Sequence, residues 1–273
     1  MNPFFIIIIL AVIEGLTEFL PVSSTGHMIL ANFFLGKSTF REEFMNHFLI
    51  IVQLGAILAV IVFFWKKVNP FVKSKEEFKK RFQLWSKVIV GVFPAAIIGL
   101  IFDDYIEQHF MNNIYIVIFT LIFYGIALMG IEHHHKKTAM KVRYASFRKL
   151  HYRTALYIGF FQCLAMIPGT SRSGATIIGA LLLGVSRPLA TEFSFYLAIP
   201  TMFGATLLKL LKTNIVYTTQ EWYYLGIGTF IAFLVAYIVI SWFMNYIQKR
   251  DFTLFGWYRI LLGIIVLVIY LLG

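Results

Sequence analysis

The sequence predicts an all-α polytopic membrane protein, and two observations support this fold class: the composition and the pattern of apolar runs. Of the 273 residues, 59% are hydrophobic and 14% are charged, and the mean hydropathy is +0.79. Soluble domains are about half apolar and about a quarter charged. Several apolar runs reach the roughly 20 residues that a helix needs to cross a bilayer. They lack the alternation of barrel strands, so helices are what can satisfy the backbone in lipid.

Six of these runs are expected to be transmembrane helices. Two connections between them are rich in Lys and Arg, one from Lys66 to Lys87 and one from Glu132 to Arg153. Because basic residues mark cytoplasmic connections, orientation explains most of the formal charge of +11. No nucleic-acid partner is therefore expected. The expected spans are residues 48–65, 86–102, 113–131, about 192–211, about 223–247 and 255–272.

Two further segments, 1–47 and 153–190, must each begin and end on one side of the membrane if the six spans alternate in direction. Pro21 and Pro168 lie in the middle of these segments. Proline removes a backbone donor and disfavours helix in the residue before it. Ser and Thr clusters follow both prolines. We therefore expect two re-entrant helical hairpins that enter from opposite faces and meet near the midplane.

The two halves of the chain also resemble each other, since PVSSTG (21–26) is echoed by PGTSRSG (168–174). If an odd number of membrane crossings separates the two halves, one half is inverted in the membrane relative to the other. Such inverted repeats commonly form a midplane site from interrupted helices. We expect one integral membrane domain, residues 1–273, with an inverted-topology repeat whose halves are about 1–132 and 153–273, joined by the second basic connection.

The first interrupted segment carries a pair of carboxylates. Glu14 and Glu18 are four residues apart, so a helix places both on one face, roughly 5–6 Å apart at Cβ. Two carboxylates in lipid repel each other and are desolvated unless a cation or a proton intervenes. Hard divalent cations take oxygen ligands of this kind, so the pair is expected to hold a metal ion against a phosphate. A protonated or hydrogen-bonded structural pair is the alternative.

Three hydroxyls and a histidine follow Pro21. Ser23, Ser24 and Thr25 precede a new apolar helix; one hydroxyl would serve as its cap, and three indicate an anion site at its N-terminus. If the helix begins at Ser24, His27 lies three residues on and shares its face. A Ser and a His within hydrogen-bond reach form a minimal activated nucleophile, so both are expected to be catalytic. A packed histidine with satisfied hydrogen bonds is the alternative.

The second interrupted segment repeats this arrangement and adds Arg172. A guanidinium cannot escape the membrane by deprotonation, and its planar fork matches phosphate or carboxylate oxygens. We expect it to bind a phosphate. The alternative, which does not exclude the first, is a salt bridge to Glu14 or Glu18 that locks the hairpins together. The other expected substrate-binding residues are Ser23, Thr25, Thr170, Ser171, Ser173 and Gly174.

With these residues identified, the chain resembles the undecaprenyl-diphosphate phosphatase family of bacteria, of the bacitracin-resistance type. The stretches EGLTEFLPVSSTGH (14–27) and PGTSRSG (168–174) stand as its two signatures, in order and at the usual separation. Chain length and hydropathy fit over essentially the whole sequence. The resemblance implies an integral enzyme of the bacterial plasma membrane that removes the terminal phosphate of undecaprenyl diphosphate, for recycling of the carrier in peptidoglycan synthesis.

The resemblance further implies a polyprenyl diphosphate lipid substrate, a divalent cation (magnesium or calcium), a site open to the outer side, and a homodimer in the membrane lipid. By the family pattern the acting residues are Glu14, Glu18, Ser24, His27 and Arg172. Ser24 is then expected to attack in line with His27 as base, while His27 or a metal-bound water stays open as the nucleophile. The competing function is a transporter or flippase of a phosphorylated lipid or small anion, because many carriers share this architecture.

Overall fold

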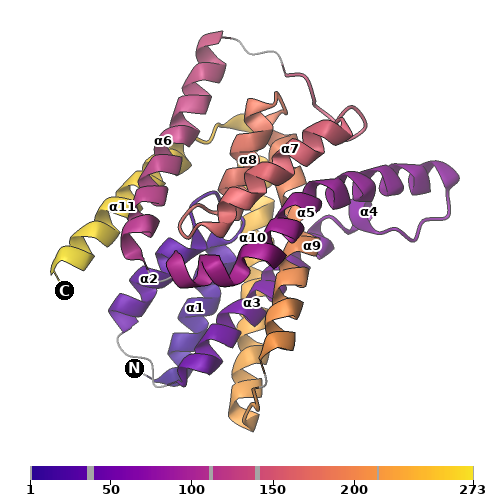
Figure 1. Ribbon diagram of the computed structural model, residues 1–273. Coiled ribbons are helices and arrows are strands. Elements are labelled where there is room, and N and C mark those ends of the chain that lie inside the picture. The colour runs from indigo at the N-terminus through magenta and orange to yellow at the C-terminus, as the bar shows by residue number, and fades with distance from the viewer. Residues whose placement is uncertain (1, 36–39, 111–112, 139–141, 214, 273) are drawn as a thin grey trace.

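The structure is a computed structural model that describes residues 2–35, 40–110, 113–138, 142–213 and 215–272, with the backbone alone described at 103, 104, 107 and 138. These residues form α-helices and one short 3-10 helix, Leu164–Met166, and no β-strand (Figure 1). The α-helices are α1 (Pro3–Thr17), α2 (Ser24–Leu35), α3 (Glu42–Phe63), α4 (Trp65–Val68), α5 (Lys75–His109), α6 (Ile114–Thr138), α7 (Tyr152–Cys163), α8 (Arg172–Leu182), α9 (Arg187–Lys212), α10 (Thr219–Lys249) and α11 (Thr253–Leu272).

Six of the described helices, α3, α5, α6, α9, α10 and α11, are long and apolar enough to cross a membrane. The predicted class, an all-α multi-pass membrane protein, is confirmed. The first basic connection is shorter than expected, because α5 begins at Lys75 and includes much of it. Glu76 and Glu77 lie in its first turn, where acidic side chains complement the partial positive charge of a helix N-terminus.

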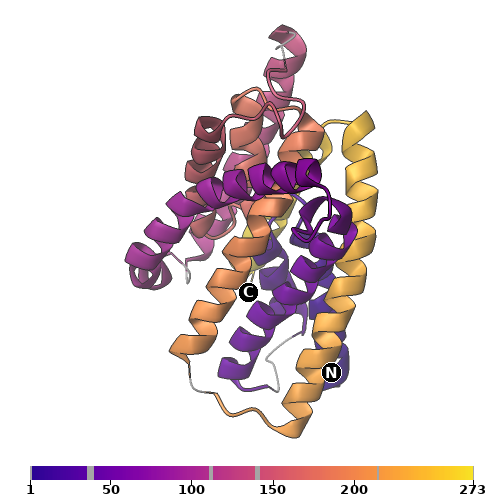
Figure 2. The ribbon, with the colours of Figure 1, turned by 90° about the vertical axis from the view of Figure 1, so that its right-hand side faces the viewer.

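The long helices α3, α9 and α10 pack as a group, with α3 between the other two (Figure 2). Close approach of α3 and α10 depends on Gly55. A Cβ at this position would overlap the backbone of Thr229. The glycine thus lets two helices pack with their backbones almost in contact, as small residues do between membrane helices.

Two of the short helices, α1 and α7, pack in corresponding ways. α1 lies along α10, and α7 lies along α5. Each of the two short helices has a glycine at the contact: a Cβ on Gly15 would lie 2.8 Å from the carbonyl oxygen of Ala232, and a Cβ on Gly159 would overlap the backbone of Gly91. This correspondence agrees with a repeated unit, while the boundaries of the two halves stay a prediction.

Both predicted interruptions are present. The chain turns between Thr17 and Ser24, and again between Cys163 and Arg172. The pair α1 and α2 occupies the lower half of the view, and the pair α7 and α8 the upper half (Figure 1). Their broken ends meet, since the hydroxyl of Ser173 donates a hydrogen bond of 2.9 Å to the carbonyl of Leu20. The re-entrant position of these hairpins in a bilayer stays a prediction.

Candidate active site

The two interruptions share one backbone geometry. Ser23 and Ser171 have φ angles of 72° and 71°, in the left-handed region. Each hydroxyl oxygen accepts a hydrogen bond from the amide three residues on, from Gly26 at 3.4 Å and from Gly174 at 3.2 Å. A left-handed conformation costs a residue with a side chain about 1–2 kcal/mol. The same strained cap therefore starts a helix in each half of the chain.

Ser24 and Arg172 follow these caps and are the first residues of α2 and α8. They occupy equivalent positions in the two halves. The first amides of a helix have no partner within it and carry partial positive charge, which makes the N-terminus an anion site. Two such N-termini lie on either side of the meeting point of the hairpins.

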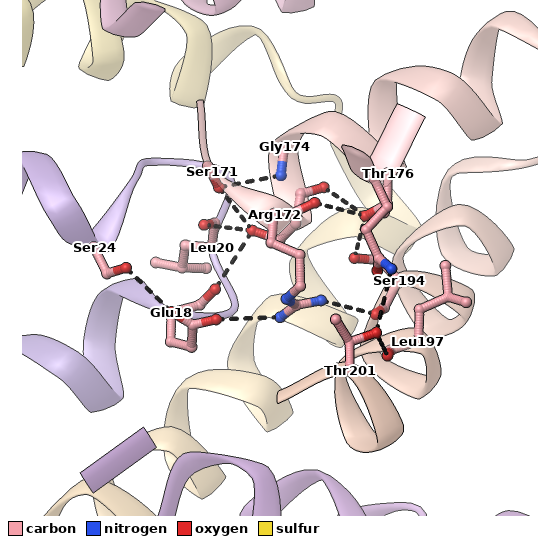
Figure 3. A network of polar contacts seen from close by, with 12 residues as sticks. Glu18, Leu20, Ser24, Ser171, Arg172, Gly174, Thr176, Ser194, Leu197 and Thr201 are labelled. Atoms are coloured by element: carbon pink, nitrogen blue, oxygen red, sulfur yellow. Dashed lines mark hydrogen bonds and ion pairs between the residues drawn. The ribbon is translucent and has the colours of Figure 1, made fainter. Parts of the chain in front are cut away.

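Glu18 joins these two helix starts (Figure 3). One of its carboxylate oxygens accepts a hydrogen bond of 3.1 Å from the hydroxyl of Ser24, and the other lies 3.4 Å from Nη2 of Arg172. The carboxylate and the guanidinium are only 9% and 11% exposed. The predicted alternative for Arg172, a salt bridge that connects the hairpins, is thus present.

The guanidinium of Arg172 is held on further sides. Its Nη1 donates to the carbonyl of Ser194 at 2.9 Å (Figure 3), and the group lies 5.6 Å from the ring centre of Phe19. Its Nε has no hydrogen-bond partner in the described residues. Because buried polar atoms are nearly always paired, this free donor marks a place where a ligand oxygen can bind.

The residues fit a divalent cation that binds together with the substrate. Glu14 is 2% exposed, lies beside Glu18, and has one carboxylate oxygen without a hydrogen-bond partner in the described part of the chain. The described residues contain no group of three or more His, Cys, Asp and Glu side chains that could hold a metal. Magnesium commonly uses one or two carboxylates together with substrate phosphates, so two carboxylates suffice.

His27 faces away from Ser24. Its Nδ1 lies 2.7 Å from the carbonyl of Ser23, and since a carbonyl only accepts, Nδ1 carries the proton. Its Nε2 therefore accepts the hydrogen bond from the hydroxyl of Tyr258, at 2.7 Å, and the two rings stack. Among the described contacts, the expected Ser24–His27 hydrogen bond is replaced by the one from Ser24 to Glu18. The reason is that Ser24 faces the end of α1, while His27 faces α11.

The remaining predicted residues divide into two groups. Ser171 and Ser173 lie at the contact of the hairpins, with their hydroxyl oxygens 3.0 Å apart. Thr170 is fully buried beside them. Thr25, by contrast, is exposed and makes no hydrogen bond with its side chain in the described structure. Three of the predicted hydroxyl groups thus lie at the site, and Thr25 lies at its edge.

Sequence reasoning missed Arg259, the largest fully buried side chain of the described structure. This residue of α11 donates to the carbonyls of Pro21 at 3.3 Å, Gly169 at 2.8 Å, Thr120 at 3.3 Å and Leu121 at 3.4 Å. The sequence does contain a signal for Arg259, because an arginine within an apolar membrane span is costly and is usually functional. The rule that singled out the paired glutamates applies to it equally.

Comparison with known proteins places the chain in a family. The sequence model of a protein family, described as bacitracin resistance protein BacA, matches residues 7–265 of this chain. The undecaprenyl-diphosphatase of Fusobacterium nucleatum is 62% identical over 96% of this chain and 99% of its own length. Undecaprenyl-diphosphatase 1 of Clostridioides difficile is 51% identical over 97% and 95%, and the undecaprenyl-diphosphatase of Enterococcus faecalis is 50% identical over 96% and 95%. The chain belongs to the bacitracin resistance protein BacA family.

Proposed function

We propose that this protein is an undecaprenyl-diphosphate phosphatase, which hydrolyses the terminal phosphate of undecaprenyl diphosphate and leaves the monophosphate carrier for cell-wall synthesis. One observation carries the proposal: Ser24, Glu18 and Arg172 form a continuous polar chain between two helix N-termini. A hydroxyl, a proton acceptor and a phosphate-binding cation therefore lie together inside an apolar protein. The names of the relatives, undecaprenyl-diphosphatases at 50–62% identity, support the same reaction.

The substrate is bound at its charged end. Its diphosphate enters between the starts of α2 and α8, where the free amides and the guanidinium of Arg172 hold the phosphate oxygens. The polyprenyl tail stays in the bilayer. The free Nε donor of Arg172 and the weak 3.4 Å contact with Glu18 leave the guanidinium able to bind phosphate without losing Ser194.

Glu14 and Glu18 are the residues that would hold magnesium or calcium. When bound, the cation supplies charge neutralisation for the phosphoryl group as it is transferred. The protein's own residues position the substrate and supply the remaining stabilisation of charge, because phosphoryl transfer depends mainly on positioning and on preorganised charge.

The geometry favours Ser24 as the nucleophile and Glu18 as its base. The Oγ of Ser24 forms a bond to the terminal phosphorus, the bond from that phosphorus to the bridging oxygen breaks, and the hydroxyl proton moves to Glu18. Undecaprenyl monophosphate leaves. Water then attacks the phosphoserine as the bond from phosphorus to Oγ of Ser24 breaks, and Glu18 returns its proton to that Oγ. One proton of the water passes to Nε2 of His27, which gives up its hydrogen bond from Tyr258, and then to the departing inorganic phosphate.

The proposed location is the bacterial plasma membrane, with the site open to the outer side. Basic residues that include Lys136, Lys249 and Arg250 gather where α6 and α10 end, and such residues favour the cytoplasmic side. The ends of α2 and α9 then face outward. A membrane-impermeant thiol reagent tests this orientation. Applied from outside to Cys163→Ala protein, it should label a cysteine introduced by Thr218→Cys and leave one introduced by Lys249→Cys unlabelled.

We also propose a homodimer, which cross-linking in native membranes would test.

The function is tested by phosphate release from undecaprenyl diphosphate. Purified protein in detergent is assayed with magnesium, with calcium and with a chelator. We expect phosphate release with a cation and little without one. A transporter would bind the lipid and release no phosphate, so binding without hydrolysis under all three conditions would refute the proposal.

A further inference from the structure

The first turns of α11 contact the site although they lie in neither interrupted segment. Two adjacent residues make these contacts, Tyr258 and Arg259. Tyr258 binds His27, which is 231 positions away in the chain, and Arg259 binds both interruptions. Neither residue takes part in a bond-making or proton-transfer step of the proposed reaction.

Arg259 binds equivalent points of the two interruptions. The carbonyl of Pro21 lies two residues before Ser23, and the carbonyl of Gly169 lies two residues before Ser171, the two residues with positive φ. One guanidinium thus holds both strained caps at a fixed separation. Because its fork is planar and rigid, it also fixes their relative orientation.

Arg259 also brings a charge that the protein does not balance. The side chain is 1% exposed, and its described hydrogen-bond acceptors are all backbone carbonyls. No carboxylate lies within ion-pair distance of it in the described residues. A buried charge without a counter-ion is costly. A diphosphate bound between the two caps carries the opposite charge and offsets that cost.

Tyr258 acts on the histidine. The carbonyl of Ser23 leaves Nε2 as the proton-accepting nitrogen of His27, and the hydroxyl of Tyr258 holds that nitrogen at 2.7 Å. The two rings are nearly parallel, 10° apart, with their centres 5.5 Å from each other. The tyrosine therefore determines where the basic nitrogen points, and water that reaches His27 must replace this hydroxyl at Nε2.

We propose that Tyr258 and Arg259 are positioning residues for phosphoryl transfer: Arg259 sets the two helix starts that bind the phosphate, and Tyr258 aims the imidazole of His27. This inference rests on the proposed function. It assigns to α11 a part in the reaction that neither sequence signature contains.

The first test removes only the hydroxyl, with Tyr258→Phe. The ring keeps its stacking, so the fold should hold. We expect kcat to fall about tenfold or more with KM within about twofold, because a misaimed group slows chemistry more than binding. The matched control is Tyr217→Phe, since the hydroxyl of Tyr217 binds Nδ1 of His47 at 2.6 Å. Equal kcat in the two variants would overturn the role of Tyr258.

The second test is Arg259→Gln. The control is Arg187→Gln, which removes an arginine that is only partly buried and binds a buried carboxylate, Glu132. Arg259→Gln should lower kcat about a hundredfold, the scale of a 1 Å misplacement, and weaken inhibition by inorganic pyrophosphate. Arg187→Gln should change Tm alone. If Arg259→Gln is not recovered folded, Arg259→Lys takes its place: it keeps the charge but not the fork, so pyrophosphate inhibition should persist while kcat falls. Normal kcat in either folded variant refutes the role of Arg259.

The activity of the wild-type protein distinguishes failure of the proposed function from failure of the role proposed for Tyr258 and Arg259. If it releases no phosphate from undecaprenyl diphosphate, the proposed function fails. If it releases phosphate and Tyr258→Phe and Arg259→Gln do so as fast as their controls, the function stands and the positioning role of α11 is wrong.

Discussion

Two predictions concern Arg172: a salt bridge between the hairpins, which the structure contains, and phosphate binding, which stays a prediction. In the structure it binds Glu18 across the hairpins, so it stabilises the fold, yet its Nε has no partner. The contact with Glu18 is long for a charged hydrogen bond, which ordinarily measures about 2.7–2.9 Å. In the proposed complex, the substrate phosphate would replace part of this pairing.

Removal of Arg172 is expected to affect the reaction strongly. Arg172→Ala should lower kcat at least about a hundredfold, the scale of one lost preorganised donor. Arg172→Lys should restore little, because an ammonium cannot reach the carbonyl of Ser194 and a phosphate in the same plane. Steady-state kinetics of the purified variants checks this. Full activity of the lysine variant would show that charge alone matters.

Ser24 is the second residue whose role can be tested directly. Ser24→Ala should lower phosphate release by at least about a hundredfold, since the alternative nucleophile lacks the base that Glu18 provides. Acid quenching of wild-type protein with substrate labelled in the terminal phosphate should trap labelled phosphoserine, and the variant should trap none. A near-normal rate in Ser24→Ala would assign the attack to His27 or to water.

At the scale of elements, close helix packing determines where the carboxylates lie. α1 carries Glu14 and ends just before Glu18, and it reaches its place against α10 because Gly15 has no side chain. A Cβ there would lie 2.8 Å from the carbonyl of Ala232. The position of the site on this side is therefore a consequence of one small residue between the two glutamates.

A larger residue at Gly15 should move α1. Gly15→Leu is expected to destabilise the protein by about 1–3 kcal/mol, the usual range for overpacking, and to lower kcat because Glu18 shifts from Ser24. Gly226→Leu on α10 is the control, since no atom lies within 4 Å of an added Cβ there. Thermal unfolding in detergent and kinetics on the same samples check both effects. Equal stability of the two variants would contradict the packing argument.

How much of the site could be predicted depends on how far apart in the chain the interacting residues are. Proline breaks a helix within a few residues, so both interruptions could be located. The helix start at Ser24, on which the reasoning about His27 depended, is present. The pairing of Ser24 with Glu18 could not be predicted, because Glu18 lies at the end of another helix. Arg259 could be suspected from its apolar surroundings, but its four carbonyl acceptors come from three separate parts of the chain.

At the scale of the whole molecule, ion pairs hold one end of the bundle together. Glu132 of α6 is fully buried and accepts hydrogen bonds from Arg187 of α9 and from the amide of Phe252, at 3.2 Å. Lys136 lies 2.5 Å from Asp251 nearby. These contacts join α6 to α9 and to the residues just before α11, and they lie away from the proposed catalytic residues.

Loss of this connection should affect stability and leave the reaction intact. Arg187→Gln leaves Glu132 buried without its cation, which should destabilise the protein on the order of 3 kcal/mol. Turnover per folded molecule, measured well below Tm, should stay unchanged. The double variant Arg187→Met with Glu132→Leu should recover much of the Tm. A Tm equal to that of wild type in Arg187→Gln would show that Glu132 is satisfied without the arginine.

The sequence by itself determined the class of the protein, the six spans, the two interruptions and most of the residues near the site, because hydropathy and proline act locally along the chain. Only the tertiary structure decided which groups meet: that Ser24 donates to Glu18, that His27 turns to Tyr258, and that Arg259 connects both hairpins. A buried polar group must bond to whatever packing brings within about 3 Å. In this protein those partners come from helices far apart in the chain.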